Sequence, residues 1–114
     1  MAKGQGFGLG LGKMKELANA FQKAQQVQEG AKKLQEELEA MNVEGTNADG
    51  SVKVILSGNQ EPRGVEISDA AIAKGADDLS AAVTEALTDA YNKSTETMRS
   101  RMEELTSGLN IPGL

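Results

Sequence analysis

A long apolar stripe with helical spacing limits the folds open to this chain. Its members recur every three or four residues, which predicts one amphipathic helix over residues 13–41. They are Met14, Leu17, Phe21, Ala24, Val27, Ala31, Leu34, Leu38 and Met41. Such a helix would be about 43 Å long, whereas a compact chain of this length has a radius of gyration of about 13 Å. The helix therefore either projects as an arm or lies against a second chain.

Glycine-rich ends flank the part of the chain that is expected to fold. Glycines occupy alternate positions from Gly4 to Gly12, and their backbone entropy favours a flexible leader over residues 1–12. This alternation matches neither G-x-G-x-x-G nor the Walker pattern of phosphate-binding loops. Gly108 and Pro112 predict a flexible tail over residues 108–114. Residues 13–107 then form a single domain.

Between residues 43 and 67 the apolar spacing changes to two, which is typical of β-strands. Segments 43–46 and 51–57 predict a hairpin around an Asp-Gly turn, and segment 63–67 follows a second turn. The sequence therefore predicts a three-stranded antiparallel meander.

A second long helix is expected over residues 77–106, after a short capped turn at residues 68–72. Its predicted buried stripe comprises Leu79, Val83, Ala86, Leu87, Ala90, Tyr91, Met98, Met102 and Leu105. One small sheet cannot cover two long stripes, so a monomer would leave much apolar surface in water. We therefore expect an α+β homodimer in which stripes and sheets find partners by two-fold symmetry.

The residue types present exclude many enzyme classes. The chain contains no Cys and no His, which removes thiolate nucleophiles, structural zinc sites and the usual general base. Asn47 and Asp49 match the middle of a calcium loop, but Gly45 and Leu56 stand where its first and last acidic ligands belong. A hairpin turn is therefore favoured over a metal site. We expect no catalytic residue, no bound metal and no small-molecule substrate.

The hydropathy pattern bears on location. No window approaches the roughly 18 to 20 apolar residues that span a bilayer. The first residues carry glycines where a signal peptide would have an apolar core. The sequence thus predicts a cytoplasmic protein without a membrane partner.

Charge is distributed unevenly along the chain, whose net charge is −5. Residues 1–33 hold six lysines against two glutamates, or +4, whereas residues 34–114 hold six basic against 15 acidic residues, or −9. These six lysines are Lys3, Lys13, Lys15, Lys23, Lys32 and Lys33. Positive charge is therefore concentrated on the first helix and its leader.

This concentration has two interpretations. If the two long helices run antiparallel from the same side of the sheet, Lys13 and Lys15 would lie near Arg99 and Arg101 and form a cationic end that binds phosphate. Alternatively, the lysines form an ordinary solvated helix face. Charge alone leaves both open.

The sequence resembles the YbaB/EbfC family of nucleoid-associated proteins over nearly its whole length. The segments that carry the resemblance are the Gly-rich leader before the helix Met14 to Met41, the block Val43-Glu44-Gly45-Thr46 with Gly50-Ser51-Val52-Lys53-Val54, the run Val65-Glu66-Ile67 and the tail Leu109-Asn110-Ile111-Pro112. The meander block is the most specific of these.

This resemblance implies a tweezer-like homodimer with helical arms that binds duplex DNA in the nucleoid, with roles in nucleoid organisation and gene regulation. It also implies no catalytic activity and no cofactor. The family's basic arm residues correspond to Lys13, Lys15, Lys23, Lys32, Lys33, Lys93, Arg99 and Arg101, and the leader adds Lys3. A competing interpretation is a non-enzymatic dimeric adaptor whose acidic surface recruits basic protein partners.

Overall fold

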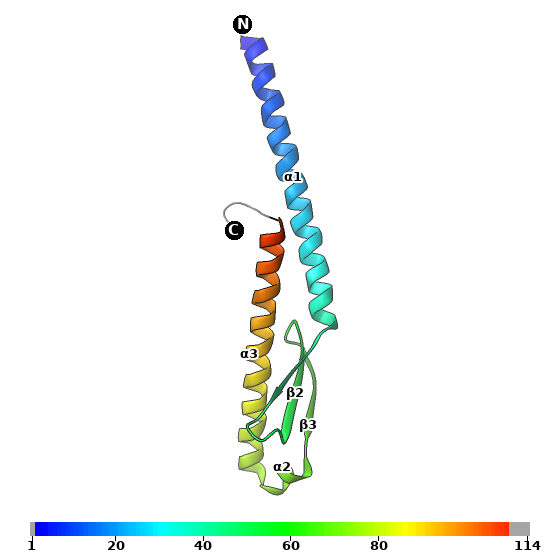
Figure 1. Ribbon diagram of the computed structural model, residues 1–114, viewed down its shortest axis with the longest axis vertical. Coiled ribbons are helices and arrows are strands. Elements are labelled where there is room, and N and C mark those ends of the chain that lie inside the picture. The colour runs from blue at the N-terminus through cyan, green and yellow to red at the C-terminus, as the bar shows by residue number, and fades with distance from the viewer. Residues whose placement is uncertain (1, 110–114) are drawn as a thin grey trace.

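The chain forms an elongated rod with a long helix projecting from one end (Figure 1). The computed structural model describes residues 2–109, and the side chains of residues 12–107. Its principal extents are 88 × 21 × 19 Å and its radius of gyration is 23.8 Å, against about 13 Å for a compact chain of this length. Within the single chain, the first helix projects as an arm (Figure 1).

The first helix, α1, spans Ala2–Ala40 and so includes the glycine-rich segment. The sequence places the start of this helix at Lys13, which is wrong. A physical reason is that an existing helix grows without a new nucleation step, and residues 2–12 contain no proline to stop it. The division into a flexible leader and a domain from residue 13 stays a prediction.

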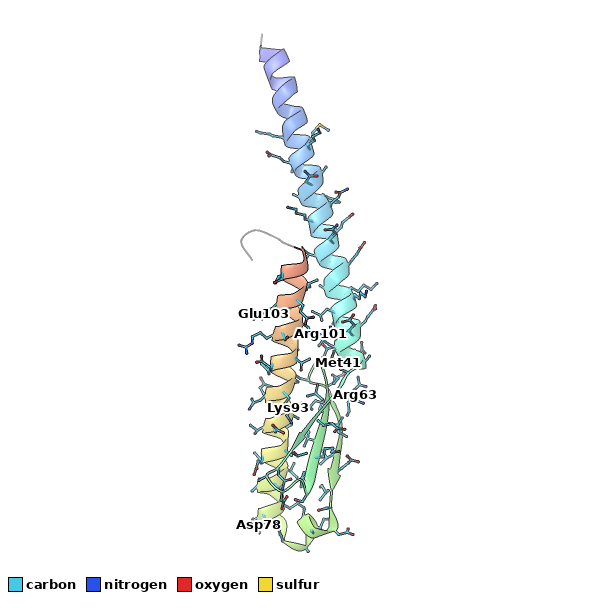
Figure 2. All side chains as sticks on the ribbon, in the orientation of Figure 1. Met41, Arg63, Asp78, Lys93, Arg101 and Glu103 are labelled. Atoms are coloured by element: carbon cyan, nitrogen blue, oxygen red, sulfur yellow. The ribbon has the colours of Figure 1, made fainter. Side chains whose placement is uncertain are left out.

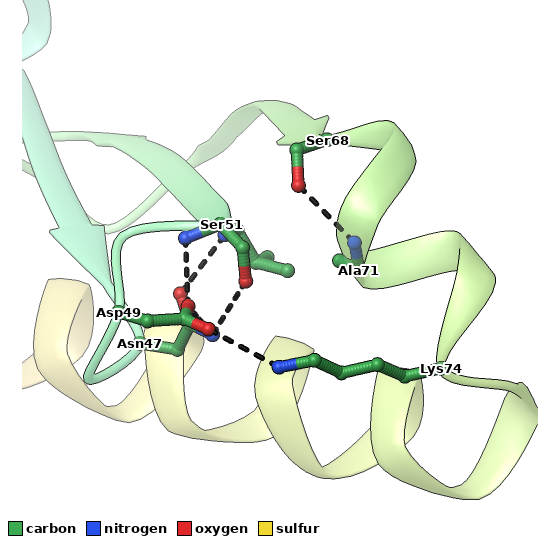
Figure 3. Close-up of polar contacts among 7 residues, drawn as sticks. Asn47, Asp49, Ser51, Ser68, Ala71 and Lys74 are labelled. Carbon is green, nitrogen blue, oxygen red and sulfur yellow. Dashed lines mark hydrogen bonds and ion pairs between the residues drawn. The ribbon is translucent and has the colours of Figure 1, made fainter.

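A three-stranded antiparallel sheet follows in the order β1-β2-β3, which confirms the predicted meander. The strands are β1 (Asn42–Thr46), β2 (Val52–Ser57) and β3 (Pro62–Ile67). The β1–β2 turn is closed by its own side chains: Asn47 Oδ1 accepts from the Val52 N–H at 2.9 Å, and Asp49 Oδ1 accepts from the Ser51 N–H at 2.9 Å (Figure 3). The calcium-like residues therefore form a hairpin turn, as the sequence predicts.

Two further helices complete the fold. The short α2 (Asp69–Ala73) begins at an N-cap, where Ser68 Oγ accepts from the Ala71 N–H at 3.2 Å (Figure 3). Gly75 then adopts a φ of 97°, which lets the chain turn into α3 (Ala76–Leu109). Helix α3 ends beyond the predicted Thr106, and the rest of the predicted tail, residues 110–114, lies outside the described residues.

The core lies between β2 and α3. Val52, Val54 and Leu56 point from one face of β2 onto Ala86 and Ala90 of α3. Small side chains let the helix approach the sheet closely. A Cβ at Gly45 in β1 would overlap the Ala90 backbone nitrogen and lie 2.5 Å from the Ala86 carbonyl oxygen. The axis of α3 is therefore fixed directly over β1 and β2.

This placement leaves part of the predicted buried stripe uncovered. Leu87, Tyr91 and Met102 are 46%, 53% and 51% exposed, so the prediction that they are buried is wrong for a single chain. Val65 and Ile67 of β3 are also exposed, although their strand partners Val54 and Val52 are buried. The reason is geometric, because α3 packs on β1 and β2 and not over the outer strand β3.

The close approach at Gly45 gives a stability prediction. Gly45→Ala should destabilise the fold by about 3 kcal/mol or more, because the added methyl meets helix backbone that cannot move aside. Thermal unfolding followed by circular dichroism measures the change. Gly64→Ala in β3 is the matched control, since its nearest neighbour would be Ile55 Cδ1 at 4.0 Å. Equal melting temperatures for the two variants would contradict the packing of α3 on β1.

Candidate nucleic-acid interface

The two long helices pack antiparallel, but with a different register from the one expected. Leu105 of α3 lies against Gly30 of α1, and Arg101 pairs with Glu37. Lys15 is therefore about 22 Å further along α1 than the level of Leu105. The prediction that Lys13 and Lys15 lie beside Arg99 and Arg101 is wrong.

The offset arises from where each helix meets the sheet. Helix α1 leaves from one end of the sheet, whereas α3 starts at the other end and first runs along the strands (Figure 1). A six-residue strand is about 20 Å long and uses about 13 residues of a covering helix. Leu105 lies against Gly30, so the end of α3 at Leu109 lies near the level of residue 26. We call residues 2–26 of α1 the distal arm.

On the sheet, at the end of α2 and on α3, every basic side chain except Arg63 lies beside a carboxylate. On the sheet, Lys53 Nζ lies 3.5 Å from Glu44 Oε2 and 3.8 Å from Glu66 Oε2. The same holds for Lys74 with Asp49 at 3.3 Å, Lys93 with Asp89 at 3.0 Å and Arg99 with Glu96. Arg101 Nη1 lies 3.5 Å from Glu37 Oε2, between the two long helices (Figure 2). We call the sheet, α2 and α3 the body.

The lysines of α1 behave differently. Lys13, Lys15, Lys23, Lys32 and Lys33 are all exposed. Among the side chains of residues 12–107, none of these five lysines has a carboxylate oxygen within 4.0 Å. Three of them stand on the distal arm, where Glu16 is the one acidic residue among residues 12–26. Helix α1 therefore presents unpaired cations on a rod that extends into solvent.

The sequence candidates thus fall into two groups. The five lysines of α1 are exposed and form no ion pair among the described side chains. Lys93, Arg99 and Arg101 of α3, in contrast, each face a carboxylate. The structure does not bring the two groups together at the arm tip. The side chain of Lys3 lies outside the described residues.

Arg63 has a role that sequence patterns did not indicate. Its guanidinium donates to the Glu39 carbonyl oxygen at the C-terminal end of α1 (Figure 2). Helix α1 has no basic residue in its own last turn, so a strand supplies the cation that its carbonyls attract. The sequence shows an Arg in the third strand, but only the fold shows that the end of α1 lies beside it.

The outer edge of β1 is covered by a pair of α3 side chains. Asp89 Oδ2 accepts from the Thr46 N–H at 3.0 Å, and Lys93 Nζ lies 3.4 Å from the Glu44 carbonyl oxygen. The Thr46 hydrogen bond, then Lys93, lower the pKa of Asp89 below its ordinary 3.8. Among the described residues, no side chain covers the outer edge of β3 in this way. The sheet therefore has one blocked edge and one open edge.

Two other kinds of site are absent from the described part of the chain. There, no group of three or more His, Cys, Asp or Glu side chains is placed to hold a metal ion. Nor does any helix within residues 2–109 combine the length and apolar character needed to cross a bilayer. The candidate site rests on the exposure and charge of the α1 lysines.

Comparison with known proteins identifies the family of this chain. The sequence profile of the YbaB/EbfC DNA-binding family matches residues 14–109. A nucleoid-associated protein of Gloeothece citriformis is 69% identical over the full length of both chains. Nucleoid-associated proteins of Thermosynechococcus vestitus and Nostoc punctiforme are 70% and 71% identical, over 100% and 97% of this chain and 99% and 96% of theirs.

These matches, together with the α+β fold, define the class as nucleoid-associated DNA-binding proteins. The chain belongs to the YbaB/EbfC DNA-binding family, which confirms the resemblance noted from its meander and tail segments.

The β1 edge gives a pH prediction. Because folding lowers the pKa of Asp89, its stabilisation is present above about pH 4 and is lost as the pH falls further. Between about pH 5 and about pH 3, Asp89→Asn should therefore lose less stability than the unmodified chain. Urea unfolding by circular dichroism at several pH values measures this, with Glu85→Gln on the same helix as control. Parallel pH profiles for Asp89→Asn and the unmodified chain would contradict the assignment.

Proposed function

We propose that this protein binds duplex DNA as a homodimer, through contacts between the lysines of α1 and the phosphate backbone. The observation that carries the proposal is the division of ion pairs. The basic residues of the body are held by carboxylates or, for Arg63, by a helix-end carbonyl, while Lys13, Lys15, Lys23, Lys32 and Lys33 remain available. Lys3, Lys93, Arg99 and Arg101 are secondary candidates. Before they could contact phosphate, the three α3 residues would have to break their ion pairs with carboxylates.

Phosphate contacts dominate in this proposal for a chemical reason. A lysine ammonium is a point charge without the planar fork that reads a guanine edge bidentately, so it supplies affinity more than sequence discrimination. The acidic body favours the same outcome, because like charge keeps DNA away from it and directs the duplex to α1.

The homodimer is supported by an uncovered apolar surface beside the open sheet edge. Val65 and Ile67 share the face of the sheet on which α3 lies. Leu87 and Tyr91 follow Ala86 and Ala90 around α3, on the flank away from Asp89 and β1. With Ile72 of α2, which is 56% exposed, they make what we call the β3–α3 patch: Val65, Ile67, Ile72, Leu87 and Tyr91.

A second copy is the proposed occupant of the β3–α3 patch. A two-fold interface there would cover apolar surface on both chains and give the open edge of β3 a neighbour. Each dimer would then carry two lysine-bearing arms on one acidic body. In this proposal, the protein contributes to nucleoid organisation and to gene regulation by occupying DNA without strict sequence preference.

Salt dependence tests the DNA proposal. If a dimer neutralises about four to six phosphates, log K should fall against log salt with a slope of about −3.5 to −5.5. Replacing Lys13 and Lys15 together by Gln should make the slope shallower by about 1 for each phosphate that is no longer neutralised. Fluorescence anisotropy with a labelled duplex measures both quantities.

The matched control replaces Lys53 and Lys74 by Gln, because it removes the same charge from two lysines that already face carboxylates. It should leave the slope almost unchanged. A slope near zero for the unmodified protein, or an equal weakening of binding in the two double variants, would contradict the proposal.

The dimer proposal is tested at Tyr91. Tyr91→Glu should convert the dimer to a monomer, because a carboxylate within the patch would have to lose its water on association. The side chain is 53% exposed in the single chain, so the fold itself should survive. Sedimentation velocity gives the mass. Asn92→Glu places the same charge on another flank of α3 and should stay dimeric. A dimeric Tyr91→Glu variant would contradict this interface.

A further inference from the structure

The distal arm carries an apolar face that no described part of the chain covers. Met14, Leu17 and Phe21 are 65%, 68% and 67% exposed. They belong to the stripe whose lower members, Leu34 and Leu38, are buried in the body. Because α3 ends near the level of residue 26, it does not reach these side chains (Figure 1). Three large apolar side chains on one face of an isolated helix form an exposed apolar patch, which is typical of a surface that binds another chain.

The spacing of this face is that of a helix-pairing seam. Met14 and Phe21 are seven residues apart and occupy a positions, and Leu17 and Ala24 occupy the d positions between and after them. The positions that flank the middle of the seam hold Ala18, Ala20 and Gln25, which are small or uncharged. A second helix could therefore approach closely without meeting like charge.

Side-chain size favours an antiparallel partner of the same sequence. In an antiparallel register centred near residue 19, Met14 faces Ala24 of the second copy, and Leu17 faces Phe21. The long Met14 side chain then packs against the small Ala24, and Leu17 packs against the larger Phe21 ring. A parallel pairing would set Phe21 against Phe21 and Ala24 against Ala24, which packs unevenly.

The flanks of the seam carry little charge. Lys13, at the outer end of the seam, lies opposite Val27 of the second copy. Glu16 and Lys23 lie about 120° to 140° around the helix from the seam, so they do not meet across it, and the direction rests on side-chain size.

We propose that the distal arm pairs antiparallel with the distal arm of a second copy, through Met14, Leu17, Phe21 and Ala24. This contact is distinct from the β3–α3 patch. A dimer with two arms would therefore join others into a chain of dimers. Lys15 lies about 140° around the helix from the seam, and Lys32 and Lys33 lie outside the paired segment. These lysines stay available to DNA, so the paired arms would hold two duplexes together.

Sedimentation velocity without DNA tests this pairing separately from DNA binding. The unmodified protein should form species larger than the dimer as its concentration rises. Leu17→Glu should raise the dissociation constant of those species by at least about a hundredfold while keeping the dimer, because each arm pair buries two copies of Leu17. Asn19→Glu adds the same charge on the opposite face and should associate normally. Unchanged association of Leu17→Glu, or its dissociation into monomers, would overturn the proposal.

Disulfide trapping tests the direction, since the chain contains no Cys. The double variant Met14→Cys with Ala24→Cys should form intermolecular disulfides under mild oxidation, whereas Ala24→Cys alone should not. Disulfides in the single variant would indicate parallel arms, and none in either variant would indicate no pairing. Either result would overturn the proposal. A truncation of residues 110–114 gives a further test: an about tenfold gain in association would identify the tail as the occupant of the seam and would also overturn the proposal.

Discussion

The close contact between α3 and the first two strands determines most of the architecture of this molecule. Gly45 lets the backbone of α3 lie directly on β1, and Ala86 and Ala90 keep the helix close to β2. A helix held this near the β1 side cannot also cover β3. The exposed β3–α3 patch and the open edge of β3 are therefore consequences of a well-packed core.

The same contact sets the reach of the arm. Since the first half of α3 is used on the sheet, its second half extends only part of the way along α1, as Leu105 against Gly30 shows. The distal arm then has no neighbour among the described residues of its own chain, and its lysines and apolar face both remain exposed. Charge is divided in the same way, because the acidic residues are concentrated in the body and hold all of its basic side chains except Arg63 in ion pairs.

Much of this fold could be predicted from the sequence, because hydrophobic periodicity and turn residues are local signals. The long helices, the meander around Asn47 and Asp49 and the Ser68 cap all arise from such signals. The start of α1 could not be predicted, since glycine propensity argues for a flexible leader and carries no information on growth from an existing helix. Periodicity also shows which side chains share a face without showing what covers it, and for this reason it predicts burial for Leu87 and Tyr91, which are exposed.

The site was predictable in composition and not in arrangement. The concentration of lysines in residues 1–33 indicated which helix carries positive charge. The pairs that neutralise the remaining basic residues include Arg101 with Glu37 and Lys74 with Asp49, which are far apart in the chain and meet only through the fold. The expected meeting of Lys13 with Arg99 does not occur for the same reason, since it depended on the register of the two helices.

The central claim is that α1 presents the free cations, while the basic residues of the body are held by carboxylates or, for Arg63, by a carbonyl oxygen. Lysine acetylation footprinting by mass spectrometry, with and without duplex DNA, tests it most directly. We expect DNA to protect Lys13, Lys15, Lys23, Lys32 and Lys33 and to leave the acetylation of Lys53 and Lys74 unchanged. Equal protection of both groups, or protection confined to the body, would contradict the claim.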